Sequence, residues 1–179
     1  MTRHPGDRLL AVLIDWLFMC AWIGLVAAVA VPLFVVGTLV RLPPVAANVI
    51  ATLVLVVPIT VALAVLESGP RQATPGKRAR RLVVQDAPTG GALPFRRALL
   101  RNALKIALPW TVAHAAVYAI AGAGSAEASA PVGSQAAVIA SYVLPVAYLV
   151  TLCLGAGRTP YDRLAGAVVT QVAPARARV

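Results

Sequence analysis

Residues 16–39 read WLFMCAWIGLVAAVAVPLFVVGTL and contain no charged side chain. A helix rises about 1.5 Å per residue, so about 20 mostly apolar residues cross the hydrocarbon core of a bilayer. This run is therefore long enough to span a membrane by itself. It is followed by the consecutive prolines Pro43 and Pro44, which cannot continue the helix.

The rest of the chain repeats this apolar character. Of its 179 residues, 60% are hydrophobic and only 12% are charged, whereas about a quarter of a soluble domain is charged. We therefore predict an all-α, polytopic membrane protein with four transmembrane helices in a single domain, residues 1–179. The expected spans are about 9–39, 45–66, 106–123 and 136–155. Each contains one proline, which spanning helices tolerate because neighbouring groups can bond the freed carbonyls.

The positive charge is distributed unequally between the two sides of this topology. Four spans place segments 1–15, 67–105 and 156–179 together, and these segments contain two, nine and four of the 16 Lys and Arg residues. Only Arg41 lies opposite. The positive-inside rule then makes the basic side, with both termini, cytoplasmic. The net charge of +10 is explained by orientation and by contact with anionic lipid, so no nucleic-acid partner is expected.

Residues 94–105, PFRRALLRNALK, precede the third expected span. Arg97, Arg101 and Lys105 recur every fourth residue and fall on one helical face. We predict a short amphipathic helix on the inner membrane surface. The alternative is that this segment is the solvated base of the third span.

Two short segments resemble each other. TPGKRARRLVV (residues 74–84) and TPYDRLAGAVV (residues 159–169) agree at five of eleven positions without a gap. This suggests tandem halves, roughly 1–92 and 93–179, although chance agreement in a chain rich in Ala and Val is the alternative. Lys77 and Asp162 occupy matching positions, so we expect them to pair.

Ionisable residues near spans are the first candidates for function, because burying them in a membrane is costly. Asp15 lies about 9 Å deep if the first helix enters the membrane at Leu9, and at the rim if it enters at Trp16. Arg8 lies nearly two turns earlier on the same helical face. We expect the pair to address one group on a neighbouring helix, and the candidates for that group are Lys77, Arg101, Lys105 and Asp162.

Other polar residues are weaker candidates. His114 and Tyr118 lie one turn apart in the third span, where a proton relay is one interpretation and interhelical hydrogen bonding is the more ordinary one. Asn102 is expected to bond across helices in the same way. The segment TPGKR lacks the first glycine of a P-loop and the Ser or Thr after its lysine, and there is no HExxH. We expect no catalytic residue, metal or cofactor.

Four ordered motifs resemble the RDD family of bacterial membrane proteins, which is named for one arginine and two aspartates. They are DRLLAVLIDWLF, TPGKRARRLVVQD, RRALLRNALK and RTPYDRLAGAVV. The resemblance implies that Arg8, Asp15 and Asp162 form the functional polar cluster and that the protein resides in a bacterial inner membrane. Arg81 and Tyr161 stand where family members often carry glycine and histidine.

Two functions remain open at this point. The first is an accessory or scaffold component of an inner-membrane system, as a homo-oligomer or in a larger membrane complex. The second is a monovalent cation/proton antiporter, or a subunit of one, in which Asp15 exchanges a proton for a cation. Family members have been proposed to have such transport activity.

Overall fold

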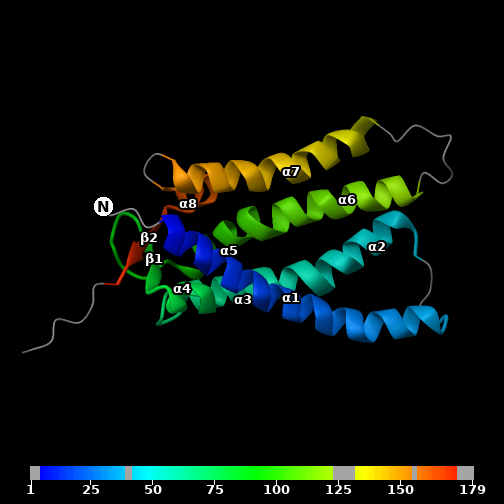
Figure 1. Cartoon of the computed structure of the whole chain (residues 1–179), viewed down its shortest axis with the longest axis horizontal. Coiled ribbons are helices and arrows are strands. Elements are labelled where there is room, and N and C mark those ends of the chain that lie inside the picture. Colours follow the sequence, from blue (N-terminus) through cyan, green and yellow to red (C-terminus); the bar gives the residue numbers. More distant parts are fainter. Residues whose placement is uncertain (1–4, 39–41, 123–131, 155–156, 173–179) are drawn as a thin grey trace, which may run out of the picture.

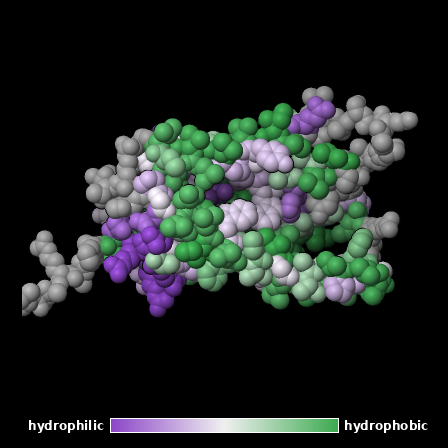
Figure 2. Space-filling view, viewed as in Figure 1, coloured by the Kyte–Doolittle hydropathy of each residue, from purple (hydrophilic) through white to green (hydrophobic). Residues whose placement is uncertain are grey.

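The computed structural model describes residues 5–38, 42–122, 132–154 and 157–172. Long helices extend side by side away from one end of the molecule, and the short elements gather at that end together with the N-terminal end of the first helix (Figure 1). The space-filling view shows hydrophilic residues concentrated at the same end and hydrophobic residues over much of the helices (Figure 2). The fold therefore separates an apolar helical part from a polar end.

The helical part consists of four long helical segments. The second and the third are each interrupted by a π-helical turn. The elements are α1 (Pro5–Val35); α2 (Pro44–Ala51), η1 (Thr52–Val56) and α3 (Val57–Ser68); α5 (Phe95–Asn102), η2 (Ala103–Ala107) and α6 (Leu108–Gly122); and α7 (Val132–Cys153). The polar end adds α4 (Pro75–Ala79), β1 (Leu82–Asp86), α8 (Pro160–Leu164) and β2 (Ala167–Gln171).

Three helices in the described part of the chain are long and apolar enough to cross a membrane, namely Pro5–Val35, Val45–Ser68 and Gln135–Cys153. They correspond to three of the four expected spans. The expected span 106–123 is not among them. The fourth crossing therefore stays a prediction. Arg41 and residues 123–131, on the side expected to be opposite, lie outside the described residues.

Two of the four prolines explain the π-helical turns. Pro58 and Pro109 each follow such a turn, and neither has an N–H to donate to the preceding turn. Side chains from other helices bond carbonyls close to those that the prolines leave free. The Trp22 indole N–H donates to the Val54 carbonyl at 3.2 Å, and the Tyr148 hydroxyl donates to the Leu104 carbonyl at 2.9 Å. These bonds satisfy the backbone where the helices deviate from α geometry.

The small antiparallel sheet at the polar end was not expected from the sequence. β1 and β2 come from the two similar segments, and Val84 pairs with its equivalent, Val169. The register is symmetric about this pair, so Leu82 faces Gln171 while Asp86 faces Ala167. Flanking hydrogen bonds follow the same symmetry, since Val172 donates to Arg81 and Ala87 donates to Gly166.

The same symmetry holds in the turn before each strand. Arg81 and Gly166 occupy equivalent positions and both have left-handed backbone conformations, with φ of 53° and 64°. Glycine adopts this conformation readily, whereas an arginine does so at some cost in free energy. The glycine-to-arginine departure noted in the sequence therefore leaves the shape of the turn intact.

Two hydrophobic clusters hold the elements together. One lies beneath the sheet and includes Ala64, Val84, Leu93 and Ala98. The other lies between helices and consists of Met19, Ile59, Leu63 and Ile106. Elsewhere the long helices expose large apolar side chains, as expected for surfaces that face lipid.

Candidate functional site

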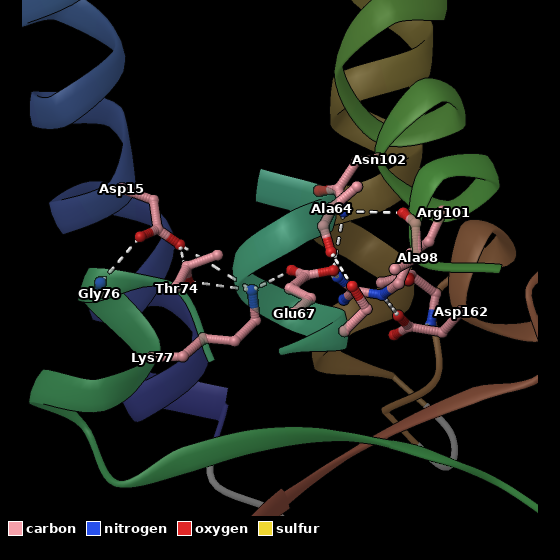
Figure 3. A network of polar contacts seen from close by, with 12 residues as sticks. Asp15, Ala64, Glu67, Thr74, Gly76, Lys77, Ala98, Arg101, Asn102 and Asp162 are labelled. Carbon is pink, nitrogen blue, oxygen red and sulfur yellow. Dashed lines mark hydrogen bonds and ion pairs between the residues drawn. The ribbon is translucent and has the colours of Figure 1, made fainter. Parts of the chain in front are cut away.

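A buried group of charged and polar side chains joins α1, α3, α4, α5 and α8 at the polar end (Figure 3). We call it the polar cluster. Its members are Arg8, Asp15, Glu67, Thr74, Lys77, Arg101, Asn102 and Asp162. It brings together the Arg and two Asp residues that the sequence singled out.

Asp15 caps the N-terminus of α4. Its Oδ2 accepts a hydrogen bond from the Thr74 hydroxyl at 2.6 Å, and its Oδ1 accepts one from the Gly76 N–H at 2.8 Å. Lys77 Nζ lies 3.9 Å from Oδ2. A carboxylate at a helix N-terminus satisfies free N–H groups and interacts favourably with the helix dipole. Asp15 is 2% exposed, so the carboxylate lies inside the protein between α1 and α4.

Gly76 is required for this close approach. A side-chain Cβ at this position would overlap the Ala11 carbonyl oxygen and lie 2.9 Å from Asp15 Oδ1. The absence of a side chain therefore lets the backbone of α4 reach α1.

Glu67 lies at the centre of the polar cluster and is fully buried. It accepts hydrogen bonds from Lys77 Nζ at 2.7 Å, from Arg101 Nη1 at 2.7 Å and from Asn102 Nδ2 at 2.8 Å. Sequence reasoning missed this role, because Glu67 is only the first residue after the expected span 45–66. The available signal was a lone carboxylate at the end of an apolar run, where an ionised group needs a partner.

Asp162 forms the second arm of the polar cluster. Its Oδ1 accepts from Arg101 Nε at 2.8 Å, and its Oδ2 accepts from Arg8 Nη2 at 3.0 Å. Oδ2 also accepts from the Thr159 N–H at 3.3 Å, which completes a capping box in α8. The segment around Asp162 thus folds back against the base of the helices.

The expected pairing of Lys77 with Asp162 is wrong. Lys77 pairs with Glu67, whereas Asp162 pairs with Arg8 and Arg101. Among the residues that the structure describes, Glu67 and Arg101 connect the two. Matching positions in the two segments do not give this arrangement, because Glu67 and Arg101 supply partners of opposite charge between them.

The expectation that Arg8 and Asp15 address one common group is also wrong. Arg8 bonds Asp162 and the Gly157 carbonyl, whereas Asp15 bonds α4. The basic face predicted for residues 94–105 is likewise partly internal. Arg101 is 2% exposed, and Arg97 pairs with Asp86 at 2.6 Å, so these charges bind protein groups.

His114 lies away from the polar cluster. It accepts a hydrogen bond from the Trp110 indole N–H on the preceding turn of α6. The side chain of Tyr118 lies outside the described residues, so the proposed relay between the two stays a prediction.

The ion pairs determine the protonation states at the polar end. Burial by itself would raise the pKa of Asp162, but Arg101 and Arg8 outweigh it and hold the pKa below the ordinary value of 3.8. Burial opposes the charged form of Arg101, yet Glu67 and Asp162 raise its pKa. Burial raises the pKa of Tyr161, which lies beneath the Arg101 guanidinium at 5.3 Å from the ring centre. These groups stay fixed in charge near neutral pH.

A small cavity of about 20 Å³ lies beside Asp15. Such a volume holds about one water molecule. Four basic side chains line it, against the single carboxylate of Asp15. They are Arg8, Lys77, Arg101 and Lys105. The electrostatic environment of the cavity therefore disfavours a cation.

The family model of the RDD family matches residues 2–166. The chain belongs to the RDD family. No curated protein and no solved structure matched the chain significantly. The match covers all the residues of the polar cluster, and together with the apolar helices it identifies an RDD-type membrane protein.

Proposed function

We propose that this RDD protein is a non-transporting, non-enzymatic accessory or scaffold component of a bacterial inner membrane, with both termini in the cytoplasm. The observation that carries the proposal is the coordination of Asp15, whose two oxygens accept hydrogen bonds from Thr74 and Gly76. A carboxylate that caps a helix is a fixed structural group. Its release to bind a cation would uncap α4.

The rest of the polar cluster supports the same role. Glu67, Arg101 and Asp162 connect α3, α5 and α8 through buried charge-assisted hydrogen bonds. Removing one partner from such a group costs about 3–5 kcal/mol, because the remaining charge is left buried without compensation. The network therefore fixes the polar end as one unit. That unit presents exposed arginines such as Arg81 and Arg96 to lipid or to partner proteins.

The alternative, a monovalent cation/proton antiporter with Asp15 as the exchanging carboxylate, is less well supported. The cavity beside Asp15 has room for about one water and is lined mainly by basic groups. A transported cation would meet electrostatic repulsion there.

Reconstitution into liposomes distinguishes the two functions. With a pH-sensitive dye inside and a gradient of Na⁺ or K⁺, we expect no ion-dependent proton flux above that of empty vesicles. Native gel electrophoresis of gently solubilised bacterial membranes should show the protein in an assembly larger than the monomer.

The matched variants are Asp15→Asn and Asp7→Asn, which remove one carboxylate each from the same helix. Asp7 pairs with Arg80 near the surface, outside the polar cluster. Cation-dependent flux that is abolished by Asp15→Asn but retained in Asp7→Asn would overturn the scaffold proposal and establish the antiporter.

A further inference from the structure

A larger cavity of about 500 Å³ lies between α1, the η2–α6 helix and α7. Its walls are mainly aromatic and aliphatic, and include Trp16, Met19, Trp110, Tyr148 and Leu149. In Figure 2, paler side chains gather between the hydrophobic helices in the middle of the visible face. The volume is in the range of pockets that bind small ligands. We call this cavity the groove.

Lys105 lies where the groove meets the polar cluster, since it lines both the groove and the small cavity beside Asp15. Among the residues that the structure describes, none forms a hydrogen bond or a direct ion pair with its ammonium group, and Glu67, Asp15 and Asp162 act on it only from beyond contact distance. The side chain is only partly exposed. A largely desolvated ammonium that no carboxylate contacts is unfavourable, so this position calls for an anion.

The charges of the site lead to the same conclusion. The three carboxylates Asp15, Glu67 and Asp162 face four basic groups, Arg8, Lys77, Arg101 and Lys105. Arg8, Lys77 and Arg101 each pair with at least one of these carboxylates. With Lys105 protonated, one positive charge is therefore in excess. Burial and the neighbouring Arg101 lower the pKa of Lys105, as expected for an ammonium without a contacting anion.

We propose that the groove binds an anionic glycerophospholipid, with an acyl chain along the apolar walls and the headgroup phosphate on Lys105. The groove is accessible from the side of the helices, because Trp16 is 47% exposed and Leu149 is 46% exposed. In a membrane those side chains face the acyl region, where phospholipid is the abundant amphiphile. A phosphate would give Lys105 a charge-assisted partner, as in other basic pockets between membrane helices.

Native mass spectrometry of the full-length protein in detergent tests the proposal. Phosphatidylglycerol and phosphatidylcholine with identical acyl chains are titrated separately. We expect phosphatidylglycerol to bind more tightly, and Lys105→Gln to weaken it about five- to tenfold, as loss of one cation near an anionic headgroup predicts. Binding of phosphatidylcholine should change little.

Two further variants separate charge from shape. Arg96→Gln removes the same charge from an exposed position on α5, and should leave phosphatidylglycerol binding unchanged. Ala113→Phe narrows the groove while keeping Lys105, and should weaken binding of phosphatidylglycerol at least as much as Lys105→Gln. If Lys105→Gln fails to fold, Ala113→Phe decides.

Three results would overturn the proposal. They are equal binding of the two lipids by the unaltered protein, unchanged phosphatidylglycerol binding in either groove variant, and a loss in Arg96→Gln as large as in Lys105→Gln. Competition by oleate as effective as that by phosphatidylglycerol would also reject the phospholipid as the occupant. The proposal does not depend on the scaffold function, because lipid binding and ion flux are measured separately.

Discussion

The segment that forms α4 and β1 can be compared residue by residue with the segment that forms α8 and β2. Each begins with a Thr-Pro pair, continues as a five-residue helix, turns through a left-handed residue and enters a five-residue strand. The helix-capping residues Thr74 and Thr159 have nearly the same backbone angles, with φ of −68° and −70°. The backbone therefore repeats, as tandem halves 1–92 and 93–179 would require.

The side chains do not repeat. α4 is capped by Asp15 from another helix, whereas α8 is capped by its own Asp162. The Gly76 position, where α4 touches α1, is taken in α8 by Tyr161, whose ring packs on Tyr148. Lys77 faces carboxylates, and Asp162 faces arginines. One backbone shape thus supports two electrostatic environments, because the surrounding helices supply the complementary charges.

The largest expected effect comes from exchanging the two charges. Lys77→Asp places a third carboxylate beside Glu67 and Asp15, and Asp162→Lys places a third cation beside Arg8 and Arg101. We expect each to cost at least about 3–5 kcal/mol. The double variant should be less stable than either single one, as measured by thermal unfolding in detergent. If the double variant were instead more stable than the single ones, a direct pair between positions 77 and 162 would be supported, against the structure.

Adding a side chain at Gly76, where α4 lies against α1, should have the next largest effect on stability. Gly76→Ala introduces a methyl group against the Ala11 carbonyl, and we expect a loss of about 1–3 kcal/mol. The matched control is Gly24→Ala in α1, where a methyl group meets no atom within 4 Å. That substitution should be neutral or slightly stabilising, because alanine favours helix. Equal unfolding temperatures for the two variants would refute the contact.

Removing the charge of Asp15, the cap of α4, while keeping the shape of its side chain should cost less stability. Asp15→Asn keeps one acceptor oxygen for Gly76 but presents an amide N–H₂ to the Thr74 hydroxyl. We expect a loss of about 1–2 kcal/mol in unfolding free energy. Asp7→Asn breaks a more exposed ion pair with Arg80 and should cost at most about 1 kcal/mol. If the two variants lose equal stability, the cap of α4 is not special.

The smallest effect concerns protonation of Asp162, which changes the stability only at acid pH. Because its pKa is lowered in the folded protein, its ion pairs contribute stability above the ordinary value of 3.8, and this contribution is lost as pH falls through the folded pKa. Stability should therefore decrease on acidification below about pH 4. In Asp162→Asn this acid-dependent part should be smaller, which unfolding curves at several pH values would measure. An identical pH dependence in the two proteins would contradict the assignment.

Much of the fold could be predicted because its signals are local. The apolar runs gave three of the expected helices. The first helix ends at Val35, ahead of Pro43 and Pro44, and Pro44 begins α2. The Arg8, Asp15 and Asp162 set followed from resemblance to the family. The strands were missed because LVV and AVV are too short for periodicity to distinguish a strand from a helix end. Only their mutual pairing makes them a sheet.

The sequence by itself determined that this is a membrane protein of the RDD family, because hydropathy and ordered motifs are properties of neighbouring residues. The tertiary structure decided which charges meet. Glu67 became the centre of the polar cluster through Arg101, 34 residues away, and Asp15 became a cap through Thr74, 59 residues away. Such pairings depend on where the packed helices place each side chain, and charge alone leaves several partners equally acceptable.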